Sequence, residues 1–103
     1  MAEPMRIRAL EKDGVVDTRV QIRHDMESGS RRNEAGEIVP AWFVTRFWLT
    51  LDEREVFSAQ LGPGVSRNPL LHFRFRGGAK GQTLVARWED NRGDSREDRG
   101  VIE

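Results

Sequence analysis

The sequence contains no cysteine, and this absence removes several kinds of chemistry at once. Without a thiol the chain has no disulfide bond, no thiolate nucleophile and no thiolate ligand for a metal ion. Any reaction that needs a thiol must therefore take place on another chain. The compartment stays open, because a protein without disulfides suits both the cytoplasm and the periplasm.

The sequence also lacks an excess of charge of one sign and lacks long apolar runs. Lys plus Arg and Asp plus Glu both number 17, so the formal net charge is zero, with no overall basic footprint for nucleic acid or an anionic membrane. A local basic stripe is still compatible with this balance. No stretch approaches the roughly 18 consecutive apolar residues of a membrane span. Residues 1–6 lack the apolar core of a signal peptide, which taken alone predicts a cytoplasmic protein.

Alternation of apolar and polar residues dominates the rest of the sequence. The length of 103 residues favours a single domain spanning residues 1–103. A period of two is typical of half-exposed strands, and it predicts strands at 5–9, 16–22, 41–51, 55–61, 70–76, 82–89 and 95–102. About seven short strands separated by turn signals predict an all-β, immunoglobulin-like sandwich of antiparallel strands.

Two segments between these strands carry turn signals. Lys12, Asp13 and Gly14 predict a tight hairpin between the first two strands, since glycine supplies a positive φ there. Residues 28–37 are polar and rich in turn formers, which predicts a long protruding loop or hairpin tip.

The segment 41–51 is apolar on both of its expected faces. We expect one face to carry Trp42, Val44 and Trp48, and the other to carry Phe43, Phe47 and Leu49. An antiparallel sandwich strand normally has one polar face, so either a loop of the same chain covers the outward residues or a partner does. Tryptophan is enriched at interface hot spots, and this favours the partner.

Basic residues near a glycine-rich turn raise the alternative of an anion site. We consider that Arg74, Arg76, Lys80 and Arg87 gather on adjacent strands, with backbone donors from residues 77–81. The competing interpretation is a solvated strand face with a flexible turn, because no helix follows the glycines. The spacing of a P-loop is missing.

No set of residues predicts catalysis or a bound cofactor. The histidines, His24 and His72, have no spacing typical of metal ligands and are expected at the polar surface. Ser58 and Ser66 lie near no candidate base, so a nucleophilic triad is not supported. We therefore expect a protein without catalytic residues, metal or cofactor.

Several motifs together resemble the SoxZ family of bacterial sulfur oxidation. The family pattern S-A-Q-x-G-P-x-V-S-x-N-P-x-L-x-F-x-F-x-G-x-x-G fits residues 58–81, and residues 24–29 and 39–44 are similar to two further family motifs. Asp25 stands where the family usually has proline, which leaves the backbone before Met26 open. The fitting positions of the long pattern are Ser58, Ala59, Gln60, Gly62, Pro63, Val65, Ser66, Asn68, Pro69, Leu71, Phe73, Phe75, Gly77 and Gly81.

The resemblance implies a function and partners. It implies a scaffold subunit that is not an enzyme and that pairs with a SoxY-like subunit, whose cysteine arm carries thiosulfate-derived sulfur between the enzymes SoxAX, SoxB and SoxCD. It also implies a periplasmic location, through export together with that partner. We expect the partner interface to include Trp42, Val44, Trp48, Arg74 and Arg76.

Two further expectations concern assembly. The isolated chain is expected to form a homodimer through the surface that the partner otherwise covers. The alternative function is a stand-alone sandwich that binds a small anion through the patch at Arg74, Arg76 and Lys80.

Overall fold

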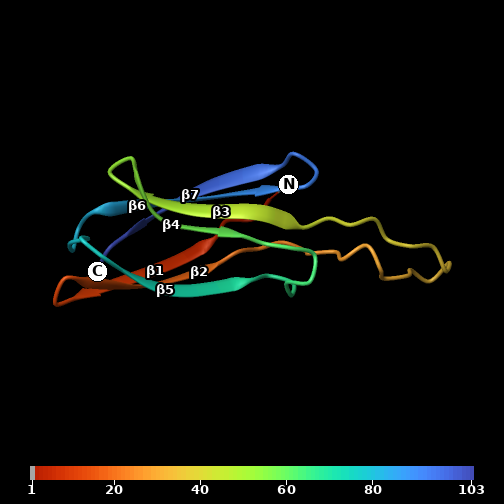
Figure 1. Ribbon diagram of the computed structural model, residues 1–103, viewed down its shortest axis with the longest axis horizontal. Coiled ribbons are helices and arrows are strands. Elements are labelled where there is room, and N and C mark those ends of the chain that lie inside the picture. The colour runs from red at the N-terminus through yellow and green to blue at the C-terminus, as the bar shows by residue number, and fades with distance from the viewer. Residues whose placement is uncertain (1) are drawn as a thin grey trace.

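The computed structural model describes residues 2–103, which form an all-β sandwich (Figure 1). Its elements are β1 (Arg6–Lys12), β2 (Val15–Gln21), β3 (Val44–Leu51), β4 (Arg54–Gln60), β5 (Leu70–Arg76), β6 (Thr83–Asp90) and β7 (Ser95–Val101). The strands form a three-stranded sheet in the order β1-β2-β5 and a four-stranded sheet in the order β4-β3-β6-β7. All ladders are antiparallel, so the predicted immunoglobulin-like sandwich of about seven strands is confirmed.

Alternation along the strands fills the space between the two sheets. Each strand turns every second side chain inward, and the inward residues form one apolar core. The largest fully buried side chains of that core include Trp88, Phe47, Ile22, Leu49, Leu84 and Ile102. At roughly 1.5–3 kcal/mol for each fully buried large apolar side chain, this core is the main source of stability.

One long edge of the sandwich is closed by strands from the two ends of the chain. Ala9 of β1 and Ile102, just after β7, form a parallel bridge between the sheets. Backbone hydrogen bonds support it, since Glu11 N donates to Glu103 O and Glu103 N donates to Ala9 O, both at 2.8 Å. Gly100 lets the strands approach closely, because a methyl group there would lie 2.7 Å from Cγ2 of Ile7.

The turn between β1 and β2 and the segment 27–42 confirm the predicted hairpins. Asp13 and Gly14 both have positive φ, as a tight hairpin turn requires. Glu27 pairs with Trp42 and Arg32 pairs with Ile38 in antiparallel bridges, so residues 27–42 form a long hairpin. This hairpin projects from one end of the sandwich (Figure 1) and explains the extents of 54 × 20 × 19 Å.

The strand expected at 41–51 begins three residues later, at Val44. Residues 41–43 do not belong to the strand because Trp42 pairs with Glu27 in the hairpin stem. A bulge between Val44 and Arg46 then shifts the register of β3 against β6. Among residues 2–103, no helix is long and apolar enough to cross a membrane.

Candidate partner-binding surfaces

The five residues predicted at the partner interface lie in separate places. Val44 is fully buried in the core, because the bulge after it changes which side chains of the segment turn inward. The expectation that Val44 shares an outward face with Trp42 and Trp48 is therefore wrong. Arg74 and Arg76 lie on the outer face of the β1-β2-β5 sheet, whereas Trp48 lies on the outer face of the other sheet.

Trp48 is half-buried by its own neighbours. The guanidinium of Arg46 lies 4.6 Å from the ring centroid, and that of Arg87 lies 5.7 Å from it. Both distances fall within the range of cation–π contacts. The outer face of β3 is therefore partly covered from within the chain, and Trp48 as a partner contact stays a prediction.

Trp42 belongs to a buried polar cluster at the end of β6. Its Nε1 donates to Asp90 Oδ2 at 2.8 Å, and the same oxygen lies 3.0 Å from Nε2 of His24. Met26 N donates to Nδ1 of His24, so the proton of the imidazole is assigned to Nε2, which donates to Asp90. Both ring nitrogens of His24 are thus used, and the imidazole offers no free base.

His24 is 6% exposed, so the expectation that it lies at the polar surface is wrong. The chain holds it in place through Asn68, whose Oδ1 accepts from His24 N and whose own N donates to His24 O. Met26 follows with a φ of 52°, a conformation that its backbone bond to the imidazole stabilises. No sequence pattern predicts this network, because its members are up to 66 residues apart.

Burial and hydrogen bonding act in opposite directions on Asp90. Desolvation raises its pKa, but the hydrogen bonds from His24, Trp42 and the backbone N–H groups of Asp94 and Arg92 outweigh it and hold the pKa below its ordinary value. Asp90 is therefore a carboxylate at neutral pH that fixes segments from both sheets.

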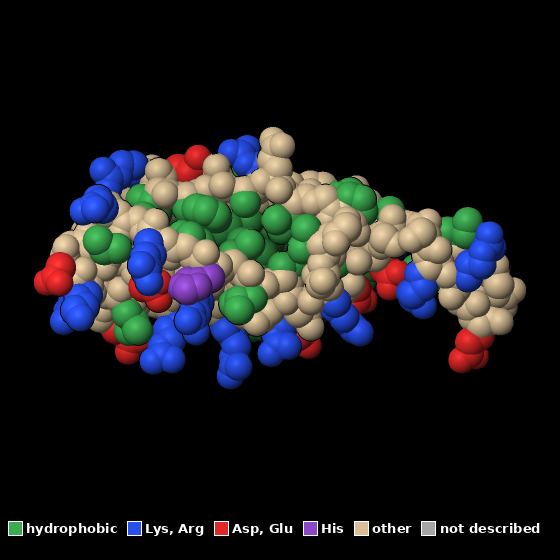
Figure 2. Space-filling view, turned by 60° about the horizontal axis from the view of Figure 1, so that its bottom comes forward, with side chains coloured by type: hydrophobic (Ala, Val, Ile, Leu, Met, Phe, Trp, Pro, Cys, Tyr) green, Lys and Arg blue, Asp and Glu red, His purple; other side chains and the backbone are tan. Residues whose placement is uncertain are grey.

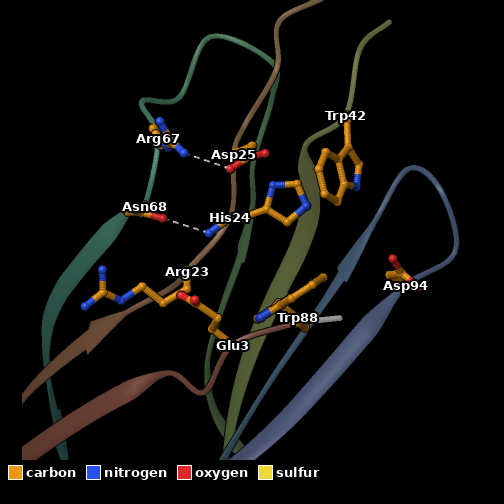
Figure 3. A pocket seen from close by; sticks show the side chains of 10 residues that line it. Glu3, Arg23, His24, Asp25, Trp42, Arg67, Asn68, Trp88 and Asp94 are labelled. Atoms are coloured by element: carbon orange, nitrogen blue, oxygen red, sulfur yellow. Dashed lines mark hydrogen bonds and ion pairs between the residues drawn. The ribbon is translucent and has the colours of Figure 1, made fainter.

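A pocket of about 290 Å³ opens beside this cluster (Figure 3). Its walls combine aromatic rings with both signs of charge, and Arg67 pairs with Asp25 at 3.2 Å. Within residues 2–103, Trp88 Nε1 is a buried donor without a hydrogen-bond partner. The pocket is lined by Ala2, Glu3, Arg23, His24, Asp25, Trp42, Arg67, Asn68, Trp88 and Asp94.

The second long edge of the sandwich, formed by β4 and β5, is open. Each of these strands pairs with one neighbour in its own sheet, and among the described residues no ladder joins them. Phe57 lies opposite Leu49 and Phe73 lies opposite Thr18, so both rings point into the sandwich. They stack face to face with centroids 3.8 Å apart.

The inward side chains along this edge are half-buried, in contrast to the rest of the core. We call this surface the open edge, and Figure 2 shows it as a patch of hydrophobic side chains between the two sheets. The sequence missed it because alternation gives the face of a residue but does not show which strands lie at an edge. The residues of the open edge are Val56, Phe57, Leu61, Val65, Leu71 and Phe73.

The basic residues considered for an anion site do not gather. Arg74 and Arg76 lie on β5, whereas Arg87 lies on β6 in the other sheet and contacts Trp48. Gly78 packs against the core, since a methyl group there would lie 2.7 Å from Cγ2 of Val16. The expectation that Arg87 belongs to this cluster is therefore wrong.

Asp17 connects the outer residues of β2 and β5. Its Oδ1 lies 2.9 Å from Nε2 of His72 and accepts from Nε of Arg74 at 3.1 Å. The hydrogen bond with His72, and after it the bond from Arg74, lower the pKa of Asp17 below its ordinary value.

These features define a class of protein. Within residues 2–103, no group of three or more His, Asp or Glu side chains is placed to hold a metal ion, and no hydrogen bond joins a serine hydroxyl to a histidine. The class that the fold defines is an immunoglobulin-like sandwich with one closed edge and one edge that exposes apolar side chains, and such edges commonly mark interaction sites. A protein-family profile described as "Sulphur oxidation protein SoxZ" matches residues 5–100, so the chain belongs to the SoxZ family.

Membership makes the chain a subunit of the Sox system of sulfur and thiosulfate oxidation, in a family of carrier and partner subunits. No curated protein sequence matches it. A crystal structure of superoxide reductase in the oxidized state is similar, with a TM-score of 0.63 and 15% identity over 99% of this chain and 89% of that chain. At this identity the likeness shows a shared fold alone.

Proposed function

We propose that the chain is the non-catalytic scaffold subunit of a SoxYZ-type sulfur carrier. It pairs one to one with a SoxY-like subunit in the periplasm, and that subunit carries thiosulfate-derived sulfur on the cysteine that this chain lacks. The scaffold stabilises the partner and leaves its arm free to visit SoxAX, SoxB and SoxCD. The membership of the family supports this role.

The observation that carries the proposal is the open edge. Phe57 and Phe73 are inward-facing residues of a sandwich, yet they stay half-buried because none of the described strands covers the edge between β4 and β5. Two unpaired strand edges beside apolar side chains are the features that strand addition by another chain uses. A partner that covers this edge gains both backbone hydrogen bonds and apolar burial.

The predicted contacts at Trp42, Trp48, Arg74 and Arg76 make a competing interface. Trp48 and Arg74 lie on opposite outer faces, so one flat partner surface cannot contact both. We propose the open edge as the main contact and keep the tryptophans as the alternative that the experiment tests.

The test is co-expression of this chain with a SoxY-like protein. Light scattering is expected to give the mass of a one-to-one heterodimer. Phe57→Ser with Phe73→Ser is expected to weaken the complex at least about tenfold, whereas Trp48→Ala is expected to leave the affinity unchanged. The lone variants are compared with the parent by near-UV circular dichroism, so that loss of fold is separated from loss of binding.

Two outcomes would contradict the proposal. Independent monomers of the two chains would remove the heterodimer and favour the stand-alone anion-binding alternative. A heterodimer that Trp48→Ala disrupts and the Phe57 and Phe73 changes do not would preserve the function but move the interface to the outer face of β3.

A further inference from the structure

The outer face of the β1-β2-β5 sheet concentrates positive charge that the neutral total conceals. Directly opposite residues in the two ladders share a face, so the register defines this surface. We call it the basic face. It consists of Arg6, Arg8, Leu10, Lys12, Val15, Asp17, Arg19, Gln21, Leu70, His72, Arg74 and Arg76.

Within this face, like charges lie directly opposite each other, and one carboxylate stands among them. Arg19 pairs directly with Arg8 on β1 and with His72 on β5, so the row across the sheet carries two guanidiniums and an imidazole. Like charges directly opposite each other destabilise a sheet. Asp17 is the acidic member of the face, and His72 and Arg74 already hold it. The arrangement therefore leaves an unbalanced positive field when the chain is alone.

The outer face of the other sheet is balanced in the same register. Arg87 lies directly opposite Glu97, and Arg46 lies 3.6 Å from Glu55. Arg99 and Glu97 approach to 3.9 Å. The charges on the outer face of one sheet are therefore balanced, while those on the other are not. Among the described strands, the excess of positive charge lies on the basic face.

Apolar side chains interrupt the charges of the basic face. Leu10 is 40% exposed and Leu70 is 57% exposed, and both belong to this face. Figure 2 shows Lys and Arg side chains crowded along the border below the hydrophobic patch of the open edge. Exposed leucines between arginines suit a protein surface with acidic groups around an apolar centre, and they offer no stacking platform for bases.

We propose that the basic face is a second docking surface, which binds an acidic surface of another protein transiently and separately from the open edge. Carboxylates of that protein would lie against Arg8 and Arg19 and relieve their repulsion. Its apolar centre would cover Leu70. Attraction of this kind speeds encounter and weakens with salt, as a short-lived docking step requires. The proposal goes beyond the heterodimer and does not depend on the open edge.

The test titrates two 12-residue peptides of equal charge into the ¹⁵N-labelled full chain, one of glutamate and serine and one in which leucine replaces two of the serines. Backbone shifts are expected on β1, β2 and β5. Arg8→Glu with Arg19→Glu is expected to weaken binding at least about tenfold, and the matched control, Arg87→Glu with Arg99→Glu, is expected to change it less than about twofold. Leu70→Ser is expected to remove the advantage of the leucine peptide.

The outcomes are separable. Equal binding of both peptides would reduce the surface to unspecific attraction and overturn the proposal, as would shifts on β3 and β6. Tighter binding of a 12-base-pair DNA duplex would assign the face to nucleic acid instead. If Arg8→Glu with Arg19→Glu abolishes the SoxY-like heterodimer, the face is the subunit interface; the proposed function then survives and this inference fails. Should this variant not fold, Arg8→Gln with Arg19→Gln repeats the test with neutral side chains.

Discussion

The two long edges of the sandwich differ in how they join the two sheets. At the β1 and β7 edge, a parallel bridge and two backbone hydrogen bonds of 2.8 Å join the sheets. At the β4 and β5 edge, the contact is a stack of two phenylalanine rings, and no backbone ladder of residues 2–103 crosses. Ile102 is 1% exposed at the closed edge, while the inward side chains of the open edge stay half-buried.

The difference shows that this sandwich does not have to expose an apolar edge, because its other long edge is closed. A domain that closes one edge with its own termini has the means to protect the other with a charged or bulged strand, as edge strands commonly are. Here β4 does carry a bulge, at Val56, yet β4 and β5 keep their stacked phenylalanines along the edge. The comparison is the basis on which we propose that the closed edge serves stability and the open edge serves binding.

The largest expected effect comes from breaking the closed edge. Ile102→Ala should lower the free energy of unfolding by about 2–5 kcal/mol, because it removes a fully buried side chain from the contact between the sheets. Urea unfolding followed by tryptophan fluorescence measures this loss. Leu71→Ala at the open edge is the matched control and should lose clearly less, since Leu71 is only partly buried. Equal losses would remove the contrast between the edges.

Adding a methyl group at Gly100 is a second test of the closed edge. Gly100→Ala places a Cβ 2.9 Å from Cβ of Ile7, so the strands must move apart, at an expected cost of about 1–3 kcal/mol. Thermal unfolding measures it. Ile7→Ala removes the Cγ2 atom that lies 2.7 Å from the new methyl group, so Ile7→Ala combined with Gly100→Ala should cost less than the sum of the two single changes. Simple additivity would show that the cost has another origin.

Asp90 adds a link between the sheets that responds to pH. Because its pKa is lowered in the folded state, its stabilising contribution is complete above its ordinary value of 3.8 and is lost as the pH falls through the lower folded value. Asp90→Asn should cost about 1–3 kcal/mol at neutral pH, since the donors of His24 and Trp42 lose a charged acceptor. In the variant, the free energy of unfolding should also fall less steeply as the pH is lowered into the acid range. An unchanged steepness would contradict this assignment.

At the open edge, stability and binding should separate. Phe73→Ala removes one ring of the stack and should lower the stability of the lone chain by about 1–2 kcal/mol, below the cost at a fully buried position. The same change should lower the affinity for the SoxY-like partner at least about tenfold, as isothermal titration calorimetry would measure. A larger loss of stability with unchanged affinity would make this edge part of the core rather than a binding surface.

The smallest expected effect is an increase in the stability of the lone chain. Arg19→Glu places a carboxylate between Arg8 and His72 and should stabilise the lone chain by about 0.2–1 kcal/mol. Denaturant unfolding at low and high salt measures it, and the gain should shrink at high salt. Arg99→Glu on the balanced sheet should give no gain, because Glu97 lies beside it.

Periodicity was sufficient to predict the seven strands, but not the face of every apolar residue. The strand 70–76 was predicted with its observed bounds, and the hairpin at Asp13 and Gly14 followed from its turn residues. Val44 was placed on the wrong face because a bulge is a tertiary adjustment that leaves no mark in an alternating pattern. His24 was misjudged because its partners, Asp90 and Trp42, come from distant parts of the chain.

The candidate surfaces needed the topology. Phe57 and Phe73 are unremarkable inward residues until β4 and β5 are known to be edge strands. The basic face likewise depends on the register, since Arg8 and Arg19 meet only when β1 and β2 are paired. Net charge, which is zero for the chain, could not reveal it.

Amide hydrogen exchange on this chain, alone and in the one-to-one complex with the SoxY-like subunit, tests the central claim most directly. The account predicts that protection rises on β4 and β5 and stays unchanged on β1 and β7. Protection gained instead on the outer face of β3 and β6, with β4 and β5 unchanged, would contradict the assignment of the open edge to the partner.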